Sequence, residues 1–431
     1  MNFNVITLGC KVNKYESQIM SENMQQNGYV LSQDKEKADI TIINTCTVTS
    51  VSDSKNKKLV RRIRRANPNG ILVLTGCMPQ AFPDDTELFD GCDIVLGNSA
   101  RAELVPAIEQ YLESKTQLIL IKEHNRKDEK FEKMSIKSFD DRTRAFIKIE
   151  DGCNRFCSYC IIPYARGAVR SKPLEDLKNE VIALTENGYK EIVLVGINLS
   201  AYGQDLGLHL LDAVKTVCEV DAVKRVRLGS IEPEMLDKES VEKLALQEKL
   251  CPQFHLSLQS GCDETLRRMN RHYDSAEYAE IVSDLRNAFK NSSITTDVMV
   301  GFVGETEEEF EKSLKFVTDI SFAKVHVFPY SRRKGTVADR ADNHIPQEIK
   351  DKRSKIMIEA VEKSRKEFLH SQVGLTEEVL FETMRSNDYC EGYTKNYTPI
   401  HVKTTENLCG QILKVKITKA EDDFCIGELC E

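Results

Sequence analysis

Short apolar runs alternate with helical stretches over the first hundred residues of the chain. The apolar runs are NVITL, DITIINT, ILVLTG and DIVLGN, and the segments between them carry helical periodicity, as in residues 15–26. Strands that alternate with helices in this way are typical of parallel βαβ units, whose sheets are covered on both faces. The pattern therefore predicts an α/β domain with a flavodoxin-like, doubly wound sheet, closed by a helix at residues 104–112.

A second series of strands and helices begins at residue 145. Helical patterns at residues 174–187 and 210–219 separate the first of its strands. Alternation of this kind predicts a parallel barrel with its active face at the carboxyl ends of the strands. We expect a partial (β/α)6 TIM-type barrel built from six strands: AFIKIE, EIVLVGIN, RVRLGSIE, FHLSLQSG, ITTDVMVGFVG and KVHVFPYS.

The remaining segments differ in character from both series. Residues 115–143 are polar and highly charged without a sustained period, as expected for a linker. A long charged helix at residues 346–370 precedes short runs such as EEVLFETM, YTPIHVKT and QILKVKIT, which predict a small antiparallel, OB-like β-barrel. We therefore expect a domain at 1–114, a linker at 115–143, a barrel with its trailing helix at 144–370 and a small barrel at 371–431.

Charge and hydropathy restrict the possible partners. The 431 residues include 60 Lys and Arg against 68 Asp and Glu, a formal charge of -8, so no global basic field predicts nucleic-acid or membrane binding. Any such partner must be met by a local patch. The first residues, MNFNVITLGC, carry no basic leader, and no stretch approaches the length of a membrane span. We expect a soluble, cytoplasmic protein with no membrane partner.

The fourteen cysteines suggest metal binding or catalysis, because the cytosol keeps thiols reduced. Cys10, Cys46 and Cys77 directly follow the apolar runs NVITLG, DITIINT and ILVLTG. Open α/β sheets gather ligand sites at the carboxyl ends of their strands, so these three thiols are expected to converge in one crevice. The alternative is three packed thiols that behave as small hydrophobes.

Three further cysteines form a C-x3-C-x2-C motif directly after the first barrel strand, at Cys153, Cys157 and Cys160. A structural zinc site uses four protein ligands, usually in two separated pairs, and fits this spacing poorly. Three thiolates can hold a [4Fe-4S] cluster and leave one iron open for a cofactor or substrate. An electron-transfer ferredoxin would normally supply a fourth cysteine.

This motif at the opening of a βα barrel resembles the radical S-adenosylmethionine family. The segments TLGCKVNKYES, INTCTVT and LTGCMPQ narrow the resemblance to the methylthiotransferases, over nearly the whole chain. The resemblance implies a [4Fe-4S] cluster on each cysteine trio, S-adenosylmethionine as methyl donor and radical source, and a terminal TRAM domain. The six cysteines would then be the catalytic and metal-binding residues.

In that family a radical removes hydrogen from the substrate carbon, which then receives a methylthio group from the amino-terminal cluster. The C2–H bond of a tRNA adenine is neither acidic nor nucleophilic, so acid–base residues alone would not activate it. An external one-electron reductant, such as a flavodoxin or ferredoxin, and a sulfur donor are implied partners.

Later strand ends resemble cofactor contacts of the family. Tyr159 stands where the family approaches adenine, and the GIN sequence departs from the commoner GGE-like motif near the methionine amine. Turn glycines and capping polar residues are the structural alternative for each position. The expected S-adenosylmethionine-binding residues are Tyr159, Gly196, Ser230, Glu232, Ser257, Gln259, Asp297, Gly301 and Gly304.

The wording of the motifs favours one substrate class. GCKVNKYES and the terminal GYTKNYTPIHV resemble the enzymes that act on tRNA N6-threonylcarbamoyladenosine 37 (t6A37). The isopentenyladenosine (i6A37) enzymes usually read GCQMN, and the ribosomal-protein aspartate enzymes read GCPKN. The substrates of these two classes remain as alternatives. A further alternative is a protein without catalytic activity, either an iron–sulfur electron carrier or an RNA-binding protein.

Local basic segments supply the patch that a tRNA anticodon stem-loop needs. KNKKLVRRIRR, residues 55–65, has no acidic residue and places several cations on one helical face. The carboxyl-terminal domain is acidic, with a small group of aromatic residues that either stack on RNA or pack in the core. The candidate RNA contacts are Lys57, Lys58, Arg61, Arg62, Arg65, Arg332, Arg333, Tyr393 and Tyr397.

Overall fold

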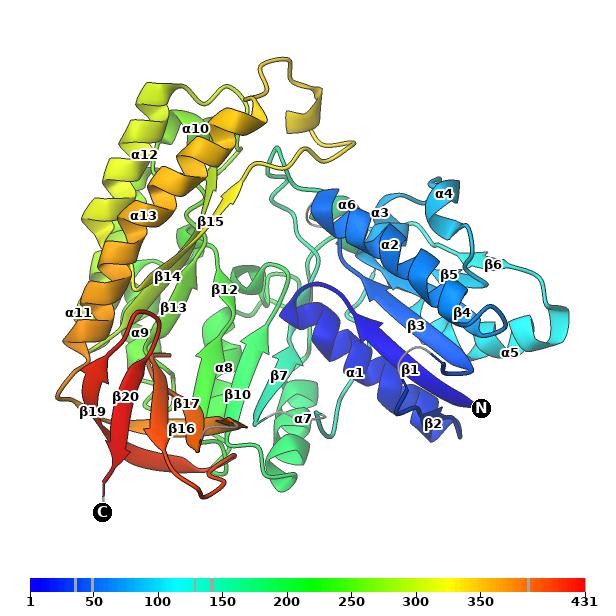
Figure 1. Ribbon diagram of the computed structural model, residues 1–431, viewed down its shortest axis with the longest axis horizontal. Helices are drawn as coiled ribbons and strands as arrows, with labels where there is room; N and C mark the ends of the chain where they lie inside the picture. The colour runs from blue at the N-terminus through cyan, green and yellow to red at the C-terminus, as the bar shows by residue number, and fades with distance from the viewer. Residues whose placement is uncertain (35–36, 48–49, 128, 140–142, 386–387, 431) are drawn as a thin grey trace.

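The computed structural model describes residues 1–34, 37–47, 50–127, 129–139, 143–385 and 388–430, and it divides into an amino-terminal α/β domain, a central partial barrel and a small closed barrel (Figure 1). Within these ranges, no helix has both the length and the apolar composition needed to cross a membrane.

The amino-terminal domain contains a six-stranded parallel sheet in the order β2-β1-β3-β4-β5-β6, the flavodoxin-like arrangement expected. Its central strands are buried on both faces, as their continuous apolar runs predict. The strands are β1 (Asn2–Thr7), β2 (Val30–Leu31), β3 (Ile40–Thr45), β4 (Ile71–Gly76), β5 (Ile94–Leu96) and β6 (Leu118–Leu120). The helices are α1 (Lys11–Gln26), α2 (Ser50–Ala66), α3 (Cys77–Ala81), α4 (Thr86–Phe89), η1 (Asn98–Glu103) and α5 (Leu104–Ser114).

Strand β6 lies within the segment expected to be a linker. It pairs with β5 at the edge of the sheet, so the amino-terminal domain extends to Leu120 rather than to residue 114. Three residues are too few to reveal a period, which is why the sequence pattern missed this strand.

The central barrel has the six expected strand positions, arranged as two parallel sheets. One sheet has the order β11-β10-β7 and the other β12-β13-β14-β15. The RVRLGSIE run contributes to both, because it divides at Gly229 into β11 and β12. The main strands are β7 (Arg144–Lys148), β10 (Glu191–Val195), β11 (Arg225–Leu228), β12 (Ser230–Ile231), β13 (Gln253–Leu256), β14 (Ser293–Val300) and β15 (Lys324–Pro329).

Helices cover the outer side of this barrel, and a two-stranded ribbon follows β7. The ribbon is β8 (Glu150–Asp151) with β9 (Arg170–Ser171). The helices are α6 (Ile162–Arg166), α7 (Leu174–Glu186), η2 (Leu199–Ala201), α8 (Leu210–Cys218), η3 (Pro233–Met235), α9 (Lys238–Ala245), α10 (Asp263–Arg268), α11 (Ser275–Ala288), α12 (Glu307–Ile320), η4 (Ala338–Arg340) and α13 (Gln347–Ser371).

The carboxyl-terminal domain is a closed five-stranded barrel in the order β16-β17-β18-β20-β19. Four of its five pairings are antiparallel, as expected for this barrel, and the pairing of β18 with β20 is parallel. The strands are β16 (Thr376–Arg385), β17 (Tyr389–Thr394), β18 (Pro399–Lys403), β19 (Ile412–Ala420) and β20 (Cys425–Leu429).

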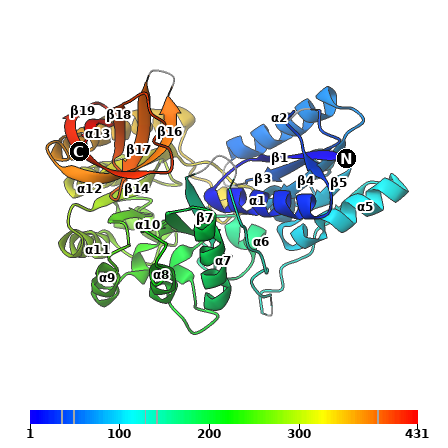
Figure 2. The same cartoon turned by 90° about the horizontal axis from the view of Figure 1, so that it is seen from below.

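The amino-terminal domain meets the central barrel through α1, which lies on the side of its own domain that faces β7 (Figure 2). Val12 and Tyr15 of α1 belong to the hydrophobic core of the barrel. Beside them the carboxylate of Glu16, fully buried, contacts Arg101, Lys148 and Arg166 at 2.9, 2.8 and 2.5 Å. A buried carboxylate requires such partners, so this interface is held by matched charges as well as by apolar packing.

Candidate active site

Cys10, Cys46 and Cys77 lie at the carboxyl ends of the neighbouring strands β1, β3 and β4, as expected. Two glycines allow their loops to approach one another. A Cβ at Gly9 would lie 2.5 Å from the Cβ of Cys46, and a Cβ at Gly76 would lie 2.4 Å from the carbonyl oxygen of Thr45. Both glycines have positive φ, which side chains disfavour. The sheet edge is therefore shaped around these thiols.

A chain of hydrogen bonds joins the first and third of these cysteines. The Sγ of Cys10 lies 3.5 Å from Oδ1 of Asn13, and Nη2 of Arg166 donates to the same oxygen at 3.0 Å. Nε of Arg166 donates to Sγ of Cys77 at 3.2 Å. The Asn13 amide also donates to the carbonyl oxygens of Leu8 and Thr45, at 3.0 and 2.9 Å. Asn13 and Arg166 thus fix the trio from inside the protein.

Arg166 comes from the central barrel, only six residues beyond Cys160. Its side chain is fully buried, so a cation from α6, the helix that follows the second trio, contacts a sulfur of the first. Sequence reasoning missed this residue. The stretch CIIPYARG, residues 160–167, contains it, but nothing in its spacing indicates a partner 89 positions away.

The second trio lies in the loop after β8. The backbone N–H of Cys160 donates to the carbonyl of Cys157 at 2.9 Å, and that of Cys153 donates to the carbonyl of Gly167 at 3.0 Å. Burial raises the pKa of Cys153 and of Cys160 to about 12, and the neighbouring Cys157 adds to both shifts. Without metal, the Cys153 and Cys160 thiols are therefore protonated at neutral pH, and metal binding must displace these two protons.

Unpartnered polar atoms beside Cys153 fit a bound cofactor. Nδ2 of Asn198 lies 3.8 Å from Sγ of Cys153, whereas its buried Oδ1 has no hydrogen-bond partner. Oε2 of Glu150 accepts from the backbone of Asn198 at 2.7 Å, and its buried Oε1 is also unpartnered. A Cβ at Gly196 would lie 2.7 Å from Oε2 of Glu150, which explains the glycine in GIN. Two buried acceptors without donors suit a ligand that carries an amino or hydroxyl group.

Two other predicted residues, Glu232 and Ser257, are linked to the second trio by hydrogen bonds from Arg271. Its guanidinium donates to Sγ of Cys157 at 3.4 Å, to the carbonyl of Ser257 at 3.2 Å and to the carboxylate of Glu232. The backbone N–H of Glu232 donates to Oγ of Ser200 at 2.8 Å. Arg271 was not among the residues expected from sequence, because it lies in a loop without a recognisable motif.

Tyr159 packs beside the loop that contains Gly301 and Gly304. Its ring meets that of Phe302 edge-on, with centroids 6.1 Å apart. Both glycines adopt positive φ, and a Cβ at Gly301 would lie 2.4 Å from Lys350. Gln259 also has positive φ and bonds through its backbone to Asp297 and Met299. The structure therefore gathers Tyr159 and this loop on one side of the second trio.

Ser230 is exposed on β12, and Asp297 is half-buried on β14 of the same barrel sheet. Ser230 pairs in register with His255, and Asp297 pairs with His326. Nε2 of His255 contacts Oδ2 of Asp297 at 3.2 Å, so the carboxylate already has a partner within the protein. Within the described ranges, neither side chain forms a hydrogen bond or ion pair with the cysteines, and their expected cofactor role stays a prediction.

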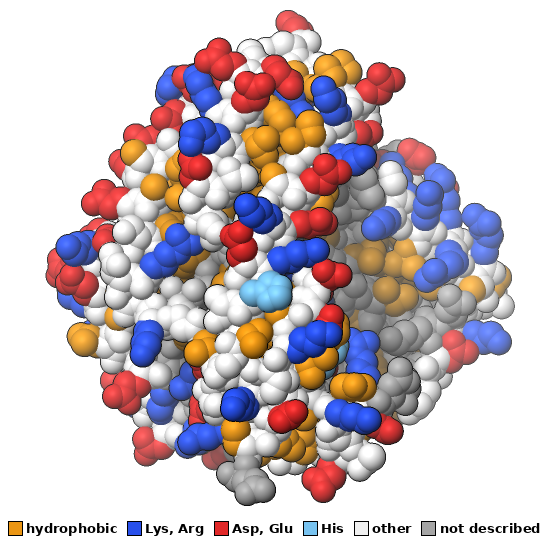
Figure 3. Space-filling view, turned by 60° about the vertical axis from the view of Figure 1, so that its left-hand side comes forward, with side chains coloured by type: hydrophobic (Ala, Val, Ile, Leu, Met, Phe, Trp, Pro, Cys, Tyr) orange, Lys and Arg blue, Asp and Glu red, His pale blue; other side chains and the backbone are white. Residues whose placement is uncertain are grey.

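The basic helix α2 carries an exposed cationic face. Among its charged residues, Lys57 and Arg61 form ion pairs with Glu87 at 3.1 Å, which reduces their charge. Figure 3 shows Lys and Arg side chains gathered on the right-hand lobe of the molecule. The exposed residues of this helix face, which we call the α2 basic face, are Lys58, Arg61, Arg62 and Arg65.

Arg332 and Arg333 follow β15 and have different surroundings. Arg332 is exposed and bonds to Asp339. Arg333 is buried, pairs with Asp53 at 2.5 Å and donates to Thr47 at 2.5 Å. A guanidinium that is occupied in this way cannot contact RNA phosphates, so the expected RNA contact at Arg333 is wrong. The residue instead ties the barrel to the loop that follows Cys46.

Tyr393 and Tyr397 form a half-buried stack between the small barrel and the central barrel. Their ring centroids are 4.6 Å apart. The guanidinium of Arg144 lies 5.3 and 5.0 Å from the two rings, and that of Arg227 lies 4.7 Å from Tyr397. This is the packing role that the sequence left open beside RNA stacking. It fixes the small barrel against the start of the central strands.

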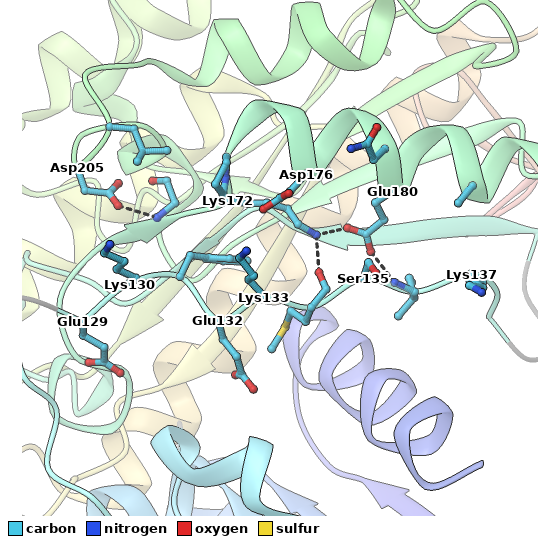
Figure 4. A pocket seen from close by; sticks show the side chains of 18 of the residues that line it. Glu129, Lys130, Glu132, Lys133, Ser135, Lys137, Lys172, Asp176, Glu180 and Asp205 are labelled. Carbon is cyan, nitrogen blue, oxygen red and sulfur yellow. Dashed lines mark hydrogen bonds and ion pairs between the residues drawn. The ribbon is translucent and has the colours of Figure 1, made fainter. Parts of the chain in front are cut away.

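A cavity of about 890 Å³ lies between the linker and α7, lined by none of the candidate residues (Figure 4). Its buried charges have partners within the protein: Lys172 pairs with Glu180 and donates to the carbonyl of Met134 at 2.8 Å. The backbone of Ser171 donates to Asp205 at 3.0 Å. The cavity is therefore separate from the two trios.

Across the described ranges, no three His, Cys, Asp or Glu side chains converge on a site for a single metal ion. A [4Fe-4S] cluster makes a different demand, because each thiolate ligates a different iron. The donor sets of three cysteines, each bordered by a guanidinium that contacts one sulfur, fit an anionic cluster better than an isolated zinc ion.

Comparison with protein families matches each domain. Residues 147–317 match the Radical SAM superfamily, residues 2–97 match the uncharacterized protein family UPF0004 and residues 370–430 match the TRAM domain. The solved structure of the radical S-adenosylmethionine methyltransferase TsrM from Kitasatospora setae, with cobalamin and a [4Fe-4S] cluster bound, gives a TM-score of 0.59 at 14% identity. It covers 78% of this chain and 77% of that one. This likeness shows the fold alone.

Several curated proteins are similar over nearly the full length. The threonylcarbamoyladenosine tRNA methylthiotransferase MtaB of Bacillus subtilis is 38% identical, over 98% of this chain and 95% of that protein. MtaB of Thermotoga maritima is 37% identical, with the same coverage. The tRNA-2-methylthio-N(6)-dimethylallyladenosine synthase of Clostridium botulinum (strain Loch Maree) is 34% identical, over 99% of this chain and 96% of that protein.

Proposed function

The chain belongs to the radical S-adenosylmethionine methylthiotransferase family, and on that premise we propose that it adds a methylthio group at C2 of t6A37 in tRNA. The MtaB proteins of Bacillus subtilis and Thermotoga maritima are 38% and 37% identical to this chain, and the dimethylallyladenosine synthase of Clostridium botulinum (strain Loch Maree) is 34% identical. The identity margin is small, so the substrate class rests on these names together with the GCKVNKYES wording around Cys10.

The observation that carries this proposal is the pair of three-cysteine sites, with Arg166, six residues beyond Cys160, in contact with Cys77 of the other site. We propose that Cys153, Cys157 and Cys160 hold one [4Fe-4S] cluster and that Cys10, Cys46 and Cys77 hold a second. When bound, the barrel cluster with S-adenosylmethionine supplies a hydrogen-abstracting radical, and the amino-terminal cluster supplies the sulfur that is transferred. The contact of Arg166 with Cys77 supports reaction between the two sites, because it joins their loops directly.

Residues of the chain would orient the cofactor beside the second trio. Asn198 and Glu150 each present an unpartnered buried oxygen and can accept from an amino or hydroxyl group of S-adenosylmethionine. Arg271 holds Glu232 and the Ser257 backbone next to Cys157. Tyr159 and the Gly301–Gly304 loop supply an apolar wall on which an adenine ring can pack. Burial of these groups keeps water from a reactive radical.

We further propose that the anticodon stem-loop of tRNA docks on the α2 basic face. Lys58, Arg61, Arg62 and Arg65 are exposed, and the helix follows the Cys46 loop directly. Phosphate contacts of this kind position an RNA without reading its sequence. We also propose that a cytoplasmic one-electron reductant and a sulfur donor, both separate from this chain, supply the reaction.

The substrate assignment is tested on tRNA from a strain that lacks the protein. Nucleosides from the deletion strain and its parent are compared by mass spectrometry. Loss of 2-methylthio-t6A with accumulation of t6A supports the proposal, and restoration by the wild-type gene completes it. Loss of the methylthio derivative of isopentenyladenosine instead would assign the second substrate class. Unchanged 2-methylthio-t6A would defeat the proposal.

The two-cluster arrangement is tested separately by anaerobic reconstitution. Two cubanes require about eight irons per chain. The triple substitution Cys10→Ala, Cys46→Ala, Cys77→Ala should retain about half of that iron and still cleave S-adenosylmethionine. Full iron content in this variant would contradict an amino-terminal cluster.

A further inference from the structure

Two exposed aromatic side chains lie within and just beyond the segment that carries the second trio. Phe156 lies between Cys153 and Cys157, and Tyr164 lies on α6, just beyond Cys160. Their exposed fractions are 41% and 52%. Large aromatic surfaces usually avoid water, so two of them beside a reaction site indicate contact with a partner.

The two rings form a defined surface together with a cation from the linker. They meet edge-on, with centroids 6.1 Å apart and planes at 80°. The guanidinium carbon of Arg126 lies 4.8 Å from the centre of the Phe156 ring. Arg126 is itself held by hydrogen bonds to the carbonyl of Pro163 at 3.0 Å and to Oδ1 of Asn154 at 3.1 Å. We call Arg126, Phe156 and Tyr164 the aromatic platform.

The backbone of Phe156 is unusual in a way that supports this surface. Its φ is +50°, in the left-handed region that bulky residues rarely adopt. The amide of Asn270 donates to the carbonyl of Phe156 at 3.1 Å and stabilises the turn. Such a conformation is strained and persists where the surroundings impose it, commonly at functional sites. Here it belongs to a loop that leaves the aromatic ring in solvent.

Aromatic rings with an adjacent guanidinium match the chemistry of an unpaired nucleobase. Proteins recognise single-stranded RNA by stacking bases on aromatic side chains and on Arg planes. The positive charge of Arg126 also suits the phosphates that flank such a base. An apolar peptide would have no group to pair with the charge of Arg126, so it fits this surface less well than RNA does. The platform also lies beside the proposed site of reaction on an anticodon loop.

We propose that the aromatic platform stacks an unpaired base of the anticodon loop next to adenosine 37. This inference rests on the proposed function. Turning adenosine 37 toward the second trio removes it from the loop stack and exposes a neighbouring base, which costs stacking energy. A base that stacks on Phe156 or Tyr164 offsets part of this cost.

The experiment uses the reconstituted full-length enzyme and t6A-containing anticodon stem-loops with 2-aminopurine at position 36 or at position 38. Stacking on an aromatic side chain quenches 2-aminopurine fluorescence. Wild-type enzyme should quench one of the two probes, whereas Phe156→Leu and Tyr164→Leu should reduce quenching and weaken binding roughly tenfold. Phe156→Trp should preserve quenching, and Arg126→Gln should weaken binding less. The matched control is Leu246→Ala, which truncates an apolar side chain that is 77% exposed at the end of α9.

The outcomes separate this inference from the proposed function. If the wild-type enzyme methylthiolates the stem-loops but the leucine variants bind and quench as it does, the stacking inference is overturned and the function stands. If the leucine variants lose iron while their quenching is unchanged, the rings shield the cluster and do not stack a base, which also overturns the inference. If the wild-type enzyme binds and quenches but forms no methylthio product, the function fails and the stacking surface stands.

Discussion

Replacement of Glu16 by Gln tests the buried charge network that joins α1 to the barrel. Burial alone would raise the pKa of Glu16, but Arg101, Arg166 and Lys148 outweigh it and lower the pKa from 4.5 to about 2. One pKa unit corresponds to about 1.4 kcal/mol, so ionisation of Glu16 stabilises the folded interface by about 3 kcal/mol. Glu16→Gln also leaves three cations with Asp151 as the remaining buried carboxylate, which adds to the loss.

The pH dependence follows from the direction of this shift. Because the folded pKa lies below the unfolded one, the stabilisation is complete above about pH 4.5 and is lost as the pH falls through about 2. The difference between wild type and Glu16→Gln should therefore be constant near neutrality and should disappear in acid.

Hydrogen exchange of the metal-free protein at pH 7 measures this effect locally. A loss of about 3 kcal/mol predicts exchange roughly 100-fold faster in the amides of α1, with little change in the barrel strand β14. The matched control is Glu113→Gln, an exposed residue near the end of α5, which should leave the exchange of α1 unaltered. An increase of less than about threefold in α1 would refute the idea that matched charges hold this interface.

Three other variants, one of them a triple substitution, test separate parts of the structure. Gly152→Ala should lower the Tm several times more than Gly188→Ala. Both glycines have φ near +90°, but only a Cβ at residue 152 would lie 1.8 Å from a carbonyl oxygen, so equal losses of Tm would contradict this steric account. The triple variant Lys58→Glu, Arg62→Glu, Arg65→Glu should weaken stem-loop binding. It should also reduce the slope of log affinity against log salt by about 0.7–0.9 per lost phosphate contact, whereas the control Lys363→Glu on α13 should change neither quantity. An unchanged slope in the triple variant would mean that the RNA binds elsewhere. Arg333→Ala should speed alkylation of Cys46, which is 6% exposed, in the metal-free protein, and Arg332→Ala should not; equal rates of alkylation would show that Arg333 does not hold this loop.

The strands and the first cysteine trio could be predicted because their signals are local. Continuous apolar runs identify β3 and β4, and the positions of Cys46 and Cys77 directly after them place both thiols at one sheet edge. The glycines at positions 9 and 76 carried a similar signal, since only a residue without a side chain fits there. Local pattern and tertiary geometry agree in this domain.

Contacts between distant charged residues could not be predicted in the same way. Arg166 and Glu16 are separated by 150 positions, and a buried ion pair leaves no period in the sequence. Arg333 was expected on the surface because it belongs to a short basic run, and only the fold brings Asp53 and Thr47 to it. Asn198 and Arg271 were missed because their importance lies in unpartnered atoms and sulfur contacts, which composition cannot reveal.

The most direct test of the central claim is the nucleoside product of the purified, reconstituted enzyme. The enzyme is supplied with S-adenosylmethionine, reductant and either a t6A37 or an i6A37 anticodon stem-loop, and the digested RNA is examined by mass spectrometry. We predict 2-methylthio-t6A from the first RNA, little product from the second, and none from Cys46→Ala, which should still cleave S-adenosylmethionine. Unmodified t6A, under conditions in which the wild-type enzyme cleaves S-adenosylmethionine, would contradict the account.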